Sequence, residues 1–199
     1  QDIGGPVSVN GSFYGPLQFR NIAKPVRFQS ERTDLRVEKV SGQLFTDLRE
    51  LTGRNLVGPI SLDTRSRDIQ LEDFTGELKL AVDRGDITLR PAQATLARIE
   101  ARTGRGKIEL ALPDAAKFQL RATTEQGEVY NDFGPALKSD SEGRRATLQS
   151  TATQGPEIVL TTDRGSITVR KDTGAPLEGA PKSRGLPEEP GRRPRVEKY

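Results

Sequence analysis

The sequence predicts an all-β protein, a single-stranded parallel β-solenoid of about nine rungs with two short strands in each rung. Short strand-like units recur along the chain at a spacing of roughly 19 residues. A second series of such units falls halfway between the members of the first, and glycine or proline stands beside most units, where turns are needed. We expect a right-handed coil, because crossovers between parallel strands are almost always right-handed.

The repeat is clearest in the segment LAVDRGDITLR, which begins at Leu80. Alternation of apolar and polar residues over three to five positions, as in this segment, is typical of a strand with one buried face. The apolar residues that mark the first series are Leu35, Ile69, Ile87, Ile108, Val129 and Ile167, with weaker members at Leu17, Leu51 and Leu148. The second series consists of Val7, Val26, Leu44, Ile60, Leu78, Ile99, Phe118, Leu137 and Ile158.

The turns between the units are too short for helical crossovers, so a stack of coils is the economical arrangement. Glycine precedes many of the buried positions by two residues, and glycine tolerates the positive φ of tight turns. Proline stands directly before other buried positions, where it can open a strand without interrupting the ladder. A β-sandwich of antiparallel hairpins is the alternative, and it is less favoured because its strands need not repeat at one period.

Two segments fit the repeat poorly, and the end of the chain differs from the rest. Residues 46–55 carry leucines at helical spacing and predict a short helix or an irregular rung. Residues 135–145 are polar and predict a loop. Beyond Lys171 the composition changes to proline, glycine and charged residues, which cannot form a core. We therefore divide the chain into a solenoid domain, residues 1–170, and a disordered tail, residues 171–199.

The composition excludes several classes of chemistry. The chain has no Cys, Met, Trp or His, so Ser-His-Asp and Cys-His nucleophilic sites and disulfides are impossible. Zinc, copper and haem sites depend on His or Cys, which leaves only an all-oxygen site for Ca²⁺ or Mg²⁺. Asp83, Asp86 and Asp163 are the nearest approach to such a site or to an acid pair for glycan cleavage. Aspartate is common at turns, so we predict no enzyme, no cofactor, and no catalytic or metal-binding residue.

Four arginines share one place in the repeat, directly before the turn glycine or its substitute: Arg32, Arg84, Arg105 and Arg164. If the rungs stack in register, these side chains project from one edge, and the middle two, Arg84 and Arg105, lie about one rung or 5 Å apart. Such a ridge could bind sulfated, phosphorylated or carboxylated polymers through bidentate contacts. The acidic residues beside these positions favour the plainer interpretation of a salt-bridged surface. These neighbours are Glu31, Asp83, Glu125 and Asp163.

Charge and hydropathy restrict the partners. The formal net charge is only +3 and no basic face interleaved with aromatic residues is evident, so we expect no specific nucleic-acid partner. No apolar run approaches the roughly 20 residues that a membrane helix needs.

The segment LPDAAKFQLRATTEQGEVYNDFG, from Leu112 to Gly134, and the recurring x-x-Gly-x-Ile/Val-x-Leu units resemble the bacterial putative-adhesin family of β-strand repeats, a domain family of unknown function. The resemblance covers most of residues 7–170. It implies a one-domain β-solenoid, usually anchored to the cell envelope by an N-terminal membrane segment that would precede Gln1. An extracytoplasmic location, in the periplasm or at the cell surface, follows from the resemblance. The basic, proline-rich tail departs from the family.

These observations predict a non-enzymatic structural or interaction domain that presents a rigid solenoid surface to a protein or glycan partner of the envelope. The open terminal coils carry unpaired backbone groups, so end-to-end self-assembly, as in bactofilin-like scaffolds, is an alternative. A polysaccharide lyase or hydrolase of the β-helix type is the third and least favoured hypothesis.

Overall fold

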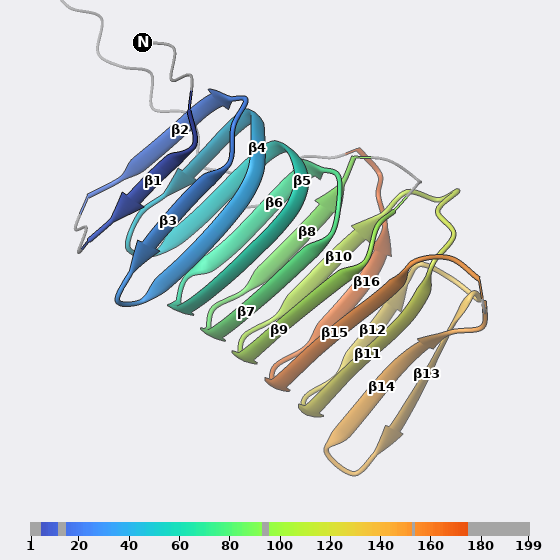
Figure 1. Ribbon diagram of the computed structural model, residues 1–199. Coiled ribbons are helices and arrows are strands. Elements are labelled where there is room, and N and C mark those ends of the chain that lie inside the picture. The colour runs from blue at the N-terminus through green and yellow to red at the C-terminus, as the bar shows by residue number, and fades with distance from the viewer. Residues whose placement is uncertain (1–4, 12–14, 93–95, 153, 175–199) are drawn as a thin grey trace, which may run out of the picture.

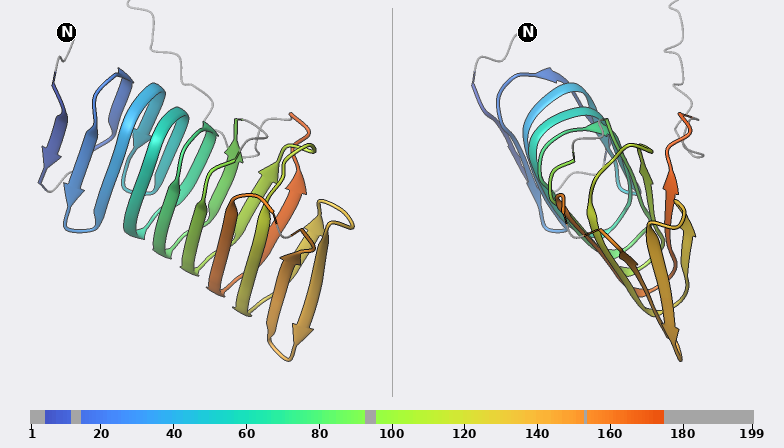
Figure 2. Two further views of the ribbon diagram at one scale, coloured as in Figure 1. Left: turned by 45° about the vertical axis from the view of Figure 1, so that its right-hand side comes forward. Right: turned by 90° about the vertical axis from the view of Figure 1, so that its right-hand side faces the viewer.

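A computed structural model describes residues 5–11, 15–92, 96–152 and 154–174 of the chain. Sixteen strands join into one sheet, and the described residues contain no helix. The sheet winds into a flattened coil whose oval cross-section is visible along its axis (Figure 2). Within the described residues, no helix suited to crossing a membrane is present.

The coil has two faces, whose strands lie side by side along the axis (Figure 1). The front face contains, in stacking order, β1 (Val7–Asn10), β3 (Val26–Ser30), the first part of β4 (Thr33–Thr46), the second part of β5 (Glu50–Ser66), β7 (Leu78–Arg84), β9 (Ile99–Arg105), β15 (Glu157–Arg164), β11 (Gln119–Gln126), β14 (Arg145–Ser150) and β13 (Leu137–Glu142). The back face contains β2 (Leu17–Ile22), the remaining parts of β4 and β5, β6 (Asp68–Phe74), β8 (Ile87–Pro91), β10 (Ile108–Leu112), β16 (Ile167–Lys171) and β12 (Val129–Asp132).

Aliphatic side chains of both faces meet inside the coil and stack in register. On the back face one inward ladder contains Leu51, Ile69, Ile87, Ile108, Ile167 and Val129. The front face has an equivalent ladder of Val7, Val26, Val37, Ile60, Leu78, Ile99, Ile158 and Leu120. Burial of each large aliphatic side chain contributes about 1.5–3 kcal/mol. The predicted all-β, solenoid-like fold is confirmed, and most of its strand pairs are parallel, whereas the number of rungs and their handedness stay predictions.

The coils do not stack in the order of the sequence. β15 pairs with both β9 and β11, and β16 pairs with both β10 and β12. The last described coil, residues 157–171, is therefore inserted between two earlier coils, residues 99–112 and 119–132 (Figure 1). The expectation that each coil lies on its predecessor is wrong here, because the repeat specifies which positions are equivalent and leaves the order of the coils open.

Antiparallel pairs stand at both ends of the stack, so the expectation of a wholly parallel solenoid is also wrong. At one end β4 runs antiparallel to β2, β3 and β5. At the other end β14 runs antiparallel to β11 and β13. The carboxylate of Asp47 accepts hydrogen bonds from the backbone N–H of Arg49 and Glu50, at 2.7 and 2.8 Å, and so closes a tight turn that reverses the chain. The hairpin at Ser30 and Thr33 already reverses β4 relative to β3. It keeps Leu35 on the front face, and β4 then brings Leu44 to the back face, opposite to their assigned series.

The two irregular segments are strands. Residues 46–55 form the end of β4, a short turn and the start of β5, so the predicted helix is absent there. Residues 135–145 include β13 and the first residue of β14, which make a hairpin in place of the predicted loop. The predicted tail, residues 171–199, lies outside the described residues from position 175 onward.

A column of glycines forms the corner at which the chain passes from the front face to the back face. We call Gly85, Gly106, Gly165 and Gly127 the glycine corner. A Cβ atom on Gly106 would lie 2.1 Å from the carbonyl oxygen of Gly85, and one on Gly165 would lie 2.0 Å from that of Gly106. Both residues have a φ near the far edge of the positive region, 151° and 144°. The coils can approach this closely only because no side chain stands between them.

Hydrogen bonds from buried threonine side chains stabilise the glycine corner. The hydroxyl of Thr103 donates to the carbonyl oxygen of Gly85 at 3.0 Å, and that of Thr124 donates to Gly165 at 2.8 Å. Thr162 donates in the same way to Gly106, at 3.2 Å. These bonds satisfy hydroxyl groups that are buried in the core. They therefore hold the register of the corner, next to which the candidate site lies.

Candidate functional site

Three of the predicted arginines end neighbouring strands of the front face. β7, β9 and β15 end at Arg84, Arg105 and Arg164, each directly before a corner glycine. Arg84 pairs in register with Arg105, and Arg105 pairs with Arg164. Strands in a sheet lie about 4.8 Å apart, so the three exposed side chains start from adjacent points on one edge. We call Arg84, Arg105 and Arg164 the arginine ridge.

Arg32, the fourth predicted member, lies in the turn between β3 and β4. Its carbonyl oxygen accepts a hydrogen bond from the N–H of Arg65, at 3.1 Å, and the next residue, Ser66, pairs with Arg84. Strand β5 thus separates Arg32 from the arginine ridge. Arg164 joins the ridge only because the inserted coil places β15 beside β9, which the spacing of the repeat does not reveal.

The acidic neighbours of the arginine ridge are partly engaged elsewhere. Asp163 pairs with Arg102 at 3.5 Å, and Glu125 pairs with Arg145 at 3.6 Å. Among the described residues, no ion pair involves a guanidinium of the ridge. Like charges on directly opposite residues destabilise a sheet. The ridge therefore concentrates positive charge that the described side chains do not pair.

A shallow hollow lies beside the arginine ridge. Its volume is about 430 Å³, and its lining includes all three ridge residues. Gly104, on β9, also lines the hollow, and a Cβ atom there would lie 2.7 Å from the carbonyl oxygen of Asp83, so β7 and β9 approach closely at this point. An anionic group in the hollow could meet more than one guanidinium. Asp83 borders the same hollow and limits how much negative charge it accepts.

Of the three aspartates considered for catalysis or metal binding, Asp83 and Asp163 border the hollow beside the arginine ridge, and Asp86 does not line it. The carboxylate of Asp86 accepts the N–H of Lys107, at 2.8 Å, and that of Asp68 accepts the N–H of Asp86, at 2.9 Å. Asp86 therefore caps a turn of the next coil, while Asp163 pairs with Arg102. Across the part of the chain that the structure describes, no three Asp or Glu side chains gather into a group that could hold a metal ion.

Arg67 precedes the glycine corner by one coil and has a packing role. Its guanidinium donates a hydrogen bond to the hydroxyl of Thr46. Burial lowers the pKa of Arg67 from its usual value because it disfavours the charged form, and the nearby carboxylate of Asp47 opposes that shift. Arg67 thus secures the turn between β4 and β5 and adds nothing to the exposed charge of the ridge.

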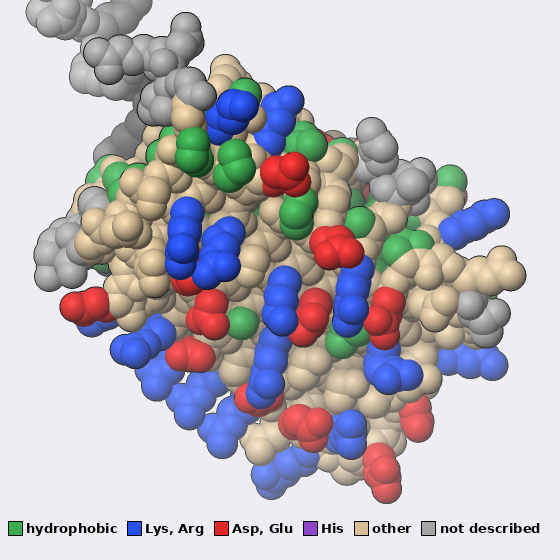
Figure 3. Space-filling view, viewed as in Figure 1, with side chains coloured by type: hydrophobic (Ala, Val, Ile, Leu, Met, Phe, Trp, Pro, Cys, Tyr) green, Lys and Arg blue, Asp and Glu red, His purple; other side chains and the backbone are tan. Residues whose placement is uncertain are grey.

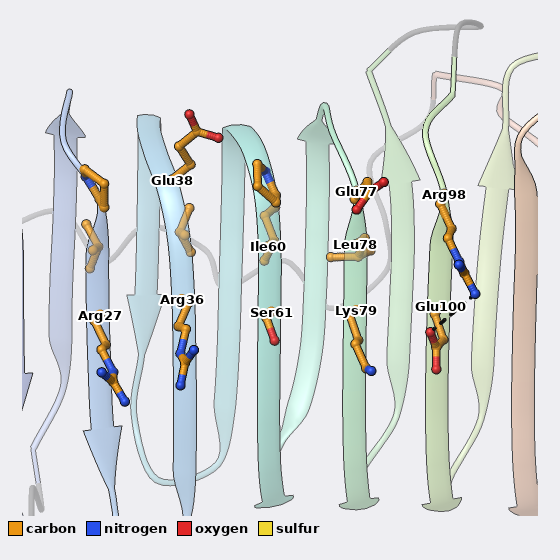
Figure 4. A pocket seen from close by; sticks show the side chains of 14 residues that line it. Arg27, Arg36, Glu38, Ile60, Ser61, Glu77, Leu78, Lys79, Arg98 and Glu100 are labelled. Carbon is orange, nitrogen blue, oxygen red and sulfur yellow. Dashed lines mark ion pairs between the residues drawn. The ribbon is translucent and has the colours of Figure 1, made fainter.

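A second hollow on the front face was missed by the sequence analysis. It has a volume of about 830 Å³ and spans β3, β4, β5, β7 and β9 (Figure 4). We call it the basic groove. A row of outward residues crosses it in register: Arg27, Arg36, Ser61, Lys79 and Glu100.

The sequence did contain a signal for the basic groove. Four of the five residues in the row directly follow a member of the second series: Arg27, Ser61, Lys79 and Glu100. The fifth, Arg36, precedes Val37 because β4 runs in the opposite direction. Basic and acidic side chains are interleaved over this face (Figure 3).

Comparison with known proteins identifies a matching family model and a similar structure. The sequence model of the Toastrack family, DUF4097, matches residues 17–170, and this match confirms the resemblance to the putative-adhesin repeats. The search of curated proteins finds no match. The crystal structure of a putative cell adhesion protein from Clostridium sporogenes is similar over 84% of this chain and 89% of that chain, with 11% sequence identity and a TM-score of 0.43.

Proposed function

Because the chain belongs to the Toastrack family of domains of unknown function, we propose that it is a non-enzymatic interaction domain of the cell envelope that binds a polyanionic partner through the arginine ridge. The observation that supports this is the in-register row of Arg84, Arg105 and Arg164 without carboxylate partners among the described residues. The ligand is a polymer that carries sulfate, phosphate or carboxylate groups, borne by a glycan or by an envelope protein. Guanidinium groups bind such anions through two parallel hydrogen bonds.

Hydrogen bonds between neighbouring coils fix the backbone that carries the arginine ridge. The N–H of Gly85 donates to the carbonyl oxygen of Arg105 at 2.9 Å, and the N–H of Gly106 donates to that of Arg164 at 3.0 Å. The Cα positions of the ridge are therefore ordered before any ligand arrives, and only the side chains lose freedom on binding. Preorganisation of this kind reduces the entropic cost of association.

Isothermal titration calorimetry with dextran sulfate and with inorganic polyphosphate tests the ridge. Uncharged dextran is the reference ligand. We expect the triple variant Arg84→Gln/Arg105→Gln/Arg164→Gln to bind both polyanions about 10- to 100-fold more weakly, because each exposed ion pair contributes up to about 1 kcal/mol. Affinity should also fall as salt is added, since exposed charges are screened.

The matched control removes three exposed cations that lie away from the ridge, in the variant Arg20→Gln/Lys39→Gln/Lys138→Gln. Both variants lose the same formal charge, so a general electrostatic attraction would weaken equally in the two. Equal losses, or no binding by the unmodified chain, would refute the role of the ridge. Thermal denaturation of each variant checks that folding is unchanged.

The proposed location outside the cytoplasm rests on the resemblance to envelope-anchored repeat domains. We expect the native protein to remain with the cell envelope when cells are fractionated, and to be cleaved by a protease added to spheroplasts or intact cells. A cytoplasmic enzyme of the same cells provides the control for lysis. Recovery of the protein with that enzyme would contradict the envelope location while leaving the test of the ridge intact.

The exposed edge of β13 argues against the alternative of end-to-end assembly. After buried Leu137, the remaining residues of β13, Lys138 to Glu142, are all exposed, and they alternate charged residues with serine. Charged side chains on an edge strand oppose pairing with another chain. This edge is therefore poorly suited to continuing the front sheet into a second copy.

A further inference from the structure

The basic groove is a second candidate binding site, separate from the arginine ridge. It lies toward the opposite margin of the front face, near Pro25, which directly precedes β3, and Pro59, which lies within β5. Ser61 stands between Arg36 and Lys79 in the row of outward residues. Its short side chain leaves the space that the longer neighbours enclose (Figure 4).

Cations line one wall of the basic groove. Arg27 lies directly opposite Arg36 on antiparallel strands, an arrangement of like charges that destabilises a sheet. Arg36 pairs with Asp34 at 3.2 Å. Within the described ranges, Arg27 and Lys79 have no ion pair. Side chains of Arg27, Arg36 and Lys79 lean the same way in Figure 4, so their charges converge on one side of the groove.

Carboxylates line the other wall. Glu38 and Glu77 border the groove, and neither forms an ion pair with a described residue. Glu38 points away from the cations in Figure 4. The position of Glu38 depends on Gly58, because a Cβ there would lie 2.7 Å from the Cβ of Glu38. Arg98 and Glu100 also line the groove, and they form an ion pair with each other at 4.0 Å. Among the described residues, the groove therefore offers unpaired cations at Arg27 and Lys79 and unpaired carboxylates at Glu38 and Glu77.

We propose that the basic groove binds an acidic oligosaccharide, a short chain of sugars that carry carboxylate groups. The sugar carboxylates bind Arg27, Arg36 and Lys79, and the sugar hydroxyls donate hydrogen bonds to Glu38 and Glu77. Sugar hydroxyls satisfy the carboxylates of Glu38 and Glu77 as hydrogen-bond donors, whereas a ligand that carries anions alone is repelled by them. The groove crosses successive strands at about 4.8 Å each, close to the length of one linked sugar ring, so neighbouring sugars meet neighbouring strands.

A tetramer of galacturonic acid is a suitable probe, with a galactose tetramer as the uncharged reference. Titrations followed by calorimetry and by NMR should show saturable binding of the acidic tetramer and little binding of the neutral one. We expect Arg27→Gln/Lys79→Gln to weaken binding at least 10-fold. Filling the hollow with Ser61→Ile should weaken it similarly without removing charge. The matched control, Arg20→Gln/Lys138→Gln, loses the same charge at two exposed residues outside both hollows and should bind within about 2-fold of the unmodified chain.

Replacing the carboxylates of Glu38 and Glu77 distinguishes recognition of an acidic sugar from recognition of negative charge alone. The variant Glu38→Gln/Glu77→Gln should bind the galacturonic acid tetramer more weakly and bind polyphosphate or a polyglutamate peptide more tightly. If the variant binds all three ligands more tightly, the groove recognises negative charge alone and the proposal is wrong. It is also wrong if the tetramer shows no saturation at millimolar concentration, or if Ser61→Ile has no effect. Because the arginine ridge is intact in every groove variant, its test succeeds or fails separately.

Discussion

Replacing Gly106 with alanine should lower the free energy of unfolding by about 3–5 kcal/mol, among the largest effects of a single substitution. The added Cβ would lie 2.1 Å from the carbonyl oxygen of Gly85, where backbone occupies the space. The φ of 151° also disfavours any residue with a side chain. Relief of the clash would require neighbouring coils to separate and would lengthen the hydrogen bond between Thr103 and Gly85.

Urea denaturation followed by circular dichroism measures this loss. Gly143→Ala is the matched control, because Gly143 also has a positive φ, of 62°, but nothing lies within 4 Å of a Cβ atom there. We expect that control to cost about 1–2 kcal/mol, the usual penalty of a left-handed conformation. Equal losses in the two variants would show that the close approach of the coils at the glycine corner is not what makes Gly106 necessary.

A chain that ends at residue 156 should fail to fold into the cooperative structure of the full chain. The deletion removes the inserted coil, whose residues Ile158, Leu160, Ile167 and Val169 are fully buried. At about 1.5–3 kcal/mol for each side chain, this loss is comparable to the whole stability of a typical domain, about 5–15 kcal/mol. It also removes the strand that joins β9 to β11 and the strand that joins β10 to β12.

The control for this deletion is a chain that ends at residue 174, which retains the inserted coil and should melt like the full chain. Thermal denaturation and the dispersion of amide signals in a ¹H–¹⁵N spectrum distinguish the two chains. If the coils stacked in sequence order, removal of the last coil would merely shorten the stack. A cooperative transition of the shorter chain near the melting temperature of the full chain would therefore contradict the inserted arrangement.

Much of the fold was predictable because it depends on short stretches of chain. Alternation of apolar and polar residues identifies a strand without knowledge of its neighbours. A common spacing then identifies equivalent positions, and Ile69, Ile87 and Ile108 do stack in register as the repeat requires. The same reasoning placed Arg84 beside Arg105. Because equivalent side chains stack in register, these local patterns are enough to identify the strands and the positions that lie beside one another.

The errors occur where the chain changes direction or order. Leu35 and Leu44 were assigned to the wrong faces because the hairpin at Ser30 and Thr33 reverses β4 relative to β3, and the Asp47 turn restores the direction only in β5. Alternation is the same for a strand read in either direction, so the periodicity contains no sign of that reversal. The basic groove was missed for the same reason, since Arg36 reaches the row of Arg27 and Lys79 only through the antiparallel pairing.

The sequence by itself determined an all-β chain, its paired series of strands, and the need for glycine at the corner. These follow from side-chain alternation and from the backbone conformation of tight turns, which act over a few residues. Only the tertiary structure decided that residues 157–171 lie between two earlier coils, so that Arg164 stands beside Arg105. Neighbouring coils offer nearly equivalent apolar ladders to one another, so their order depends on the free energy of the whole stack, which no local pattern records.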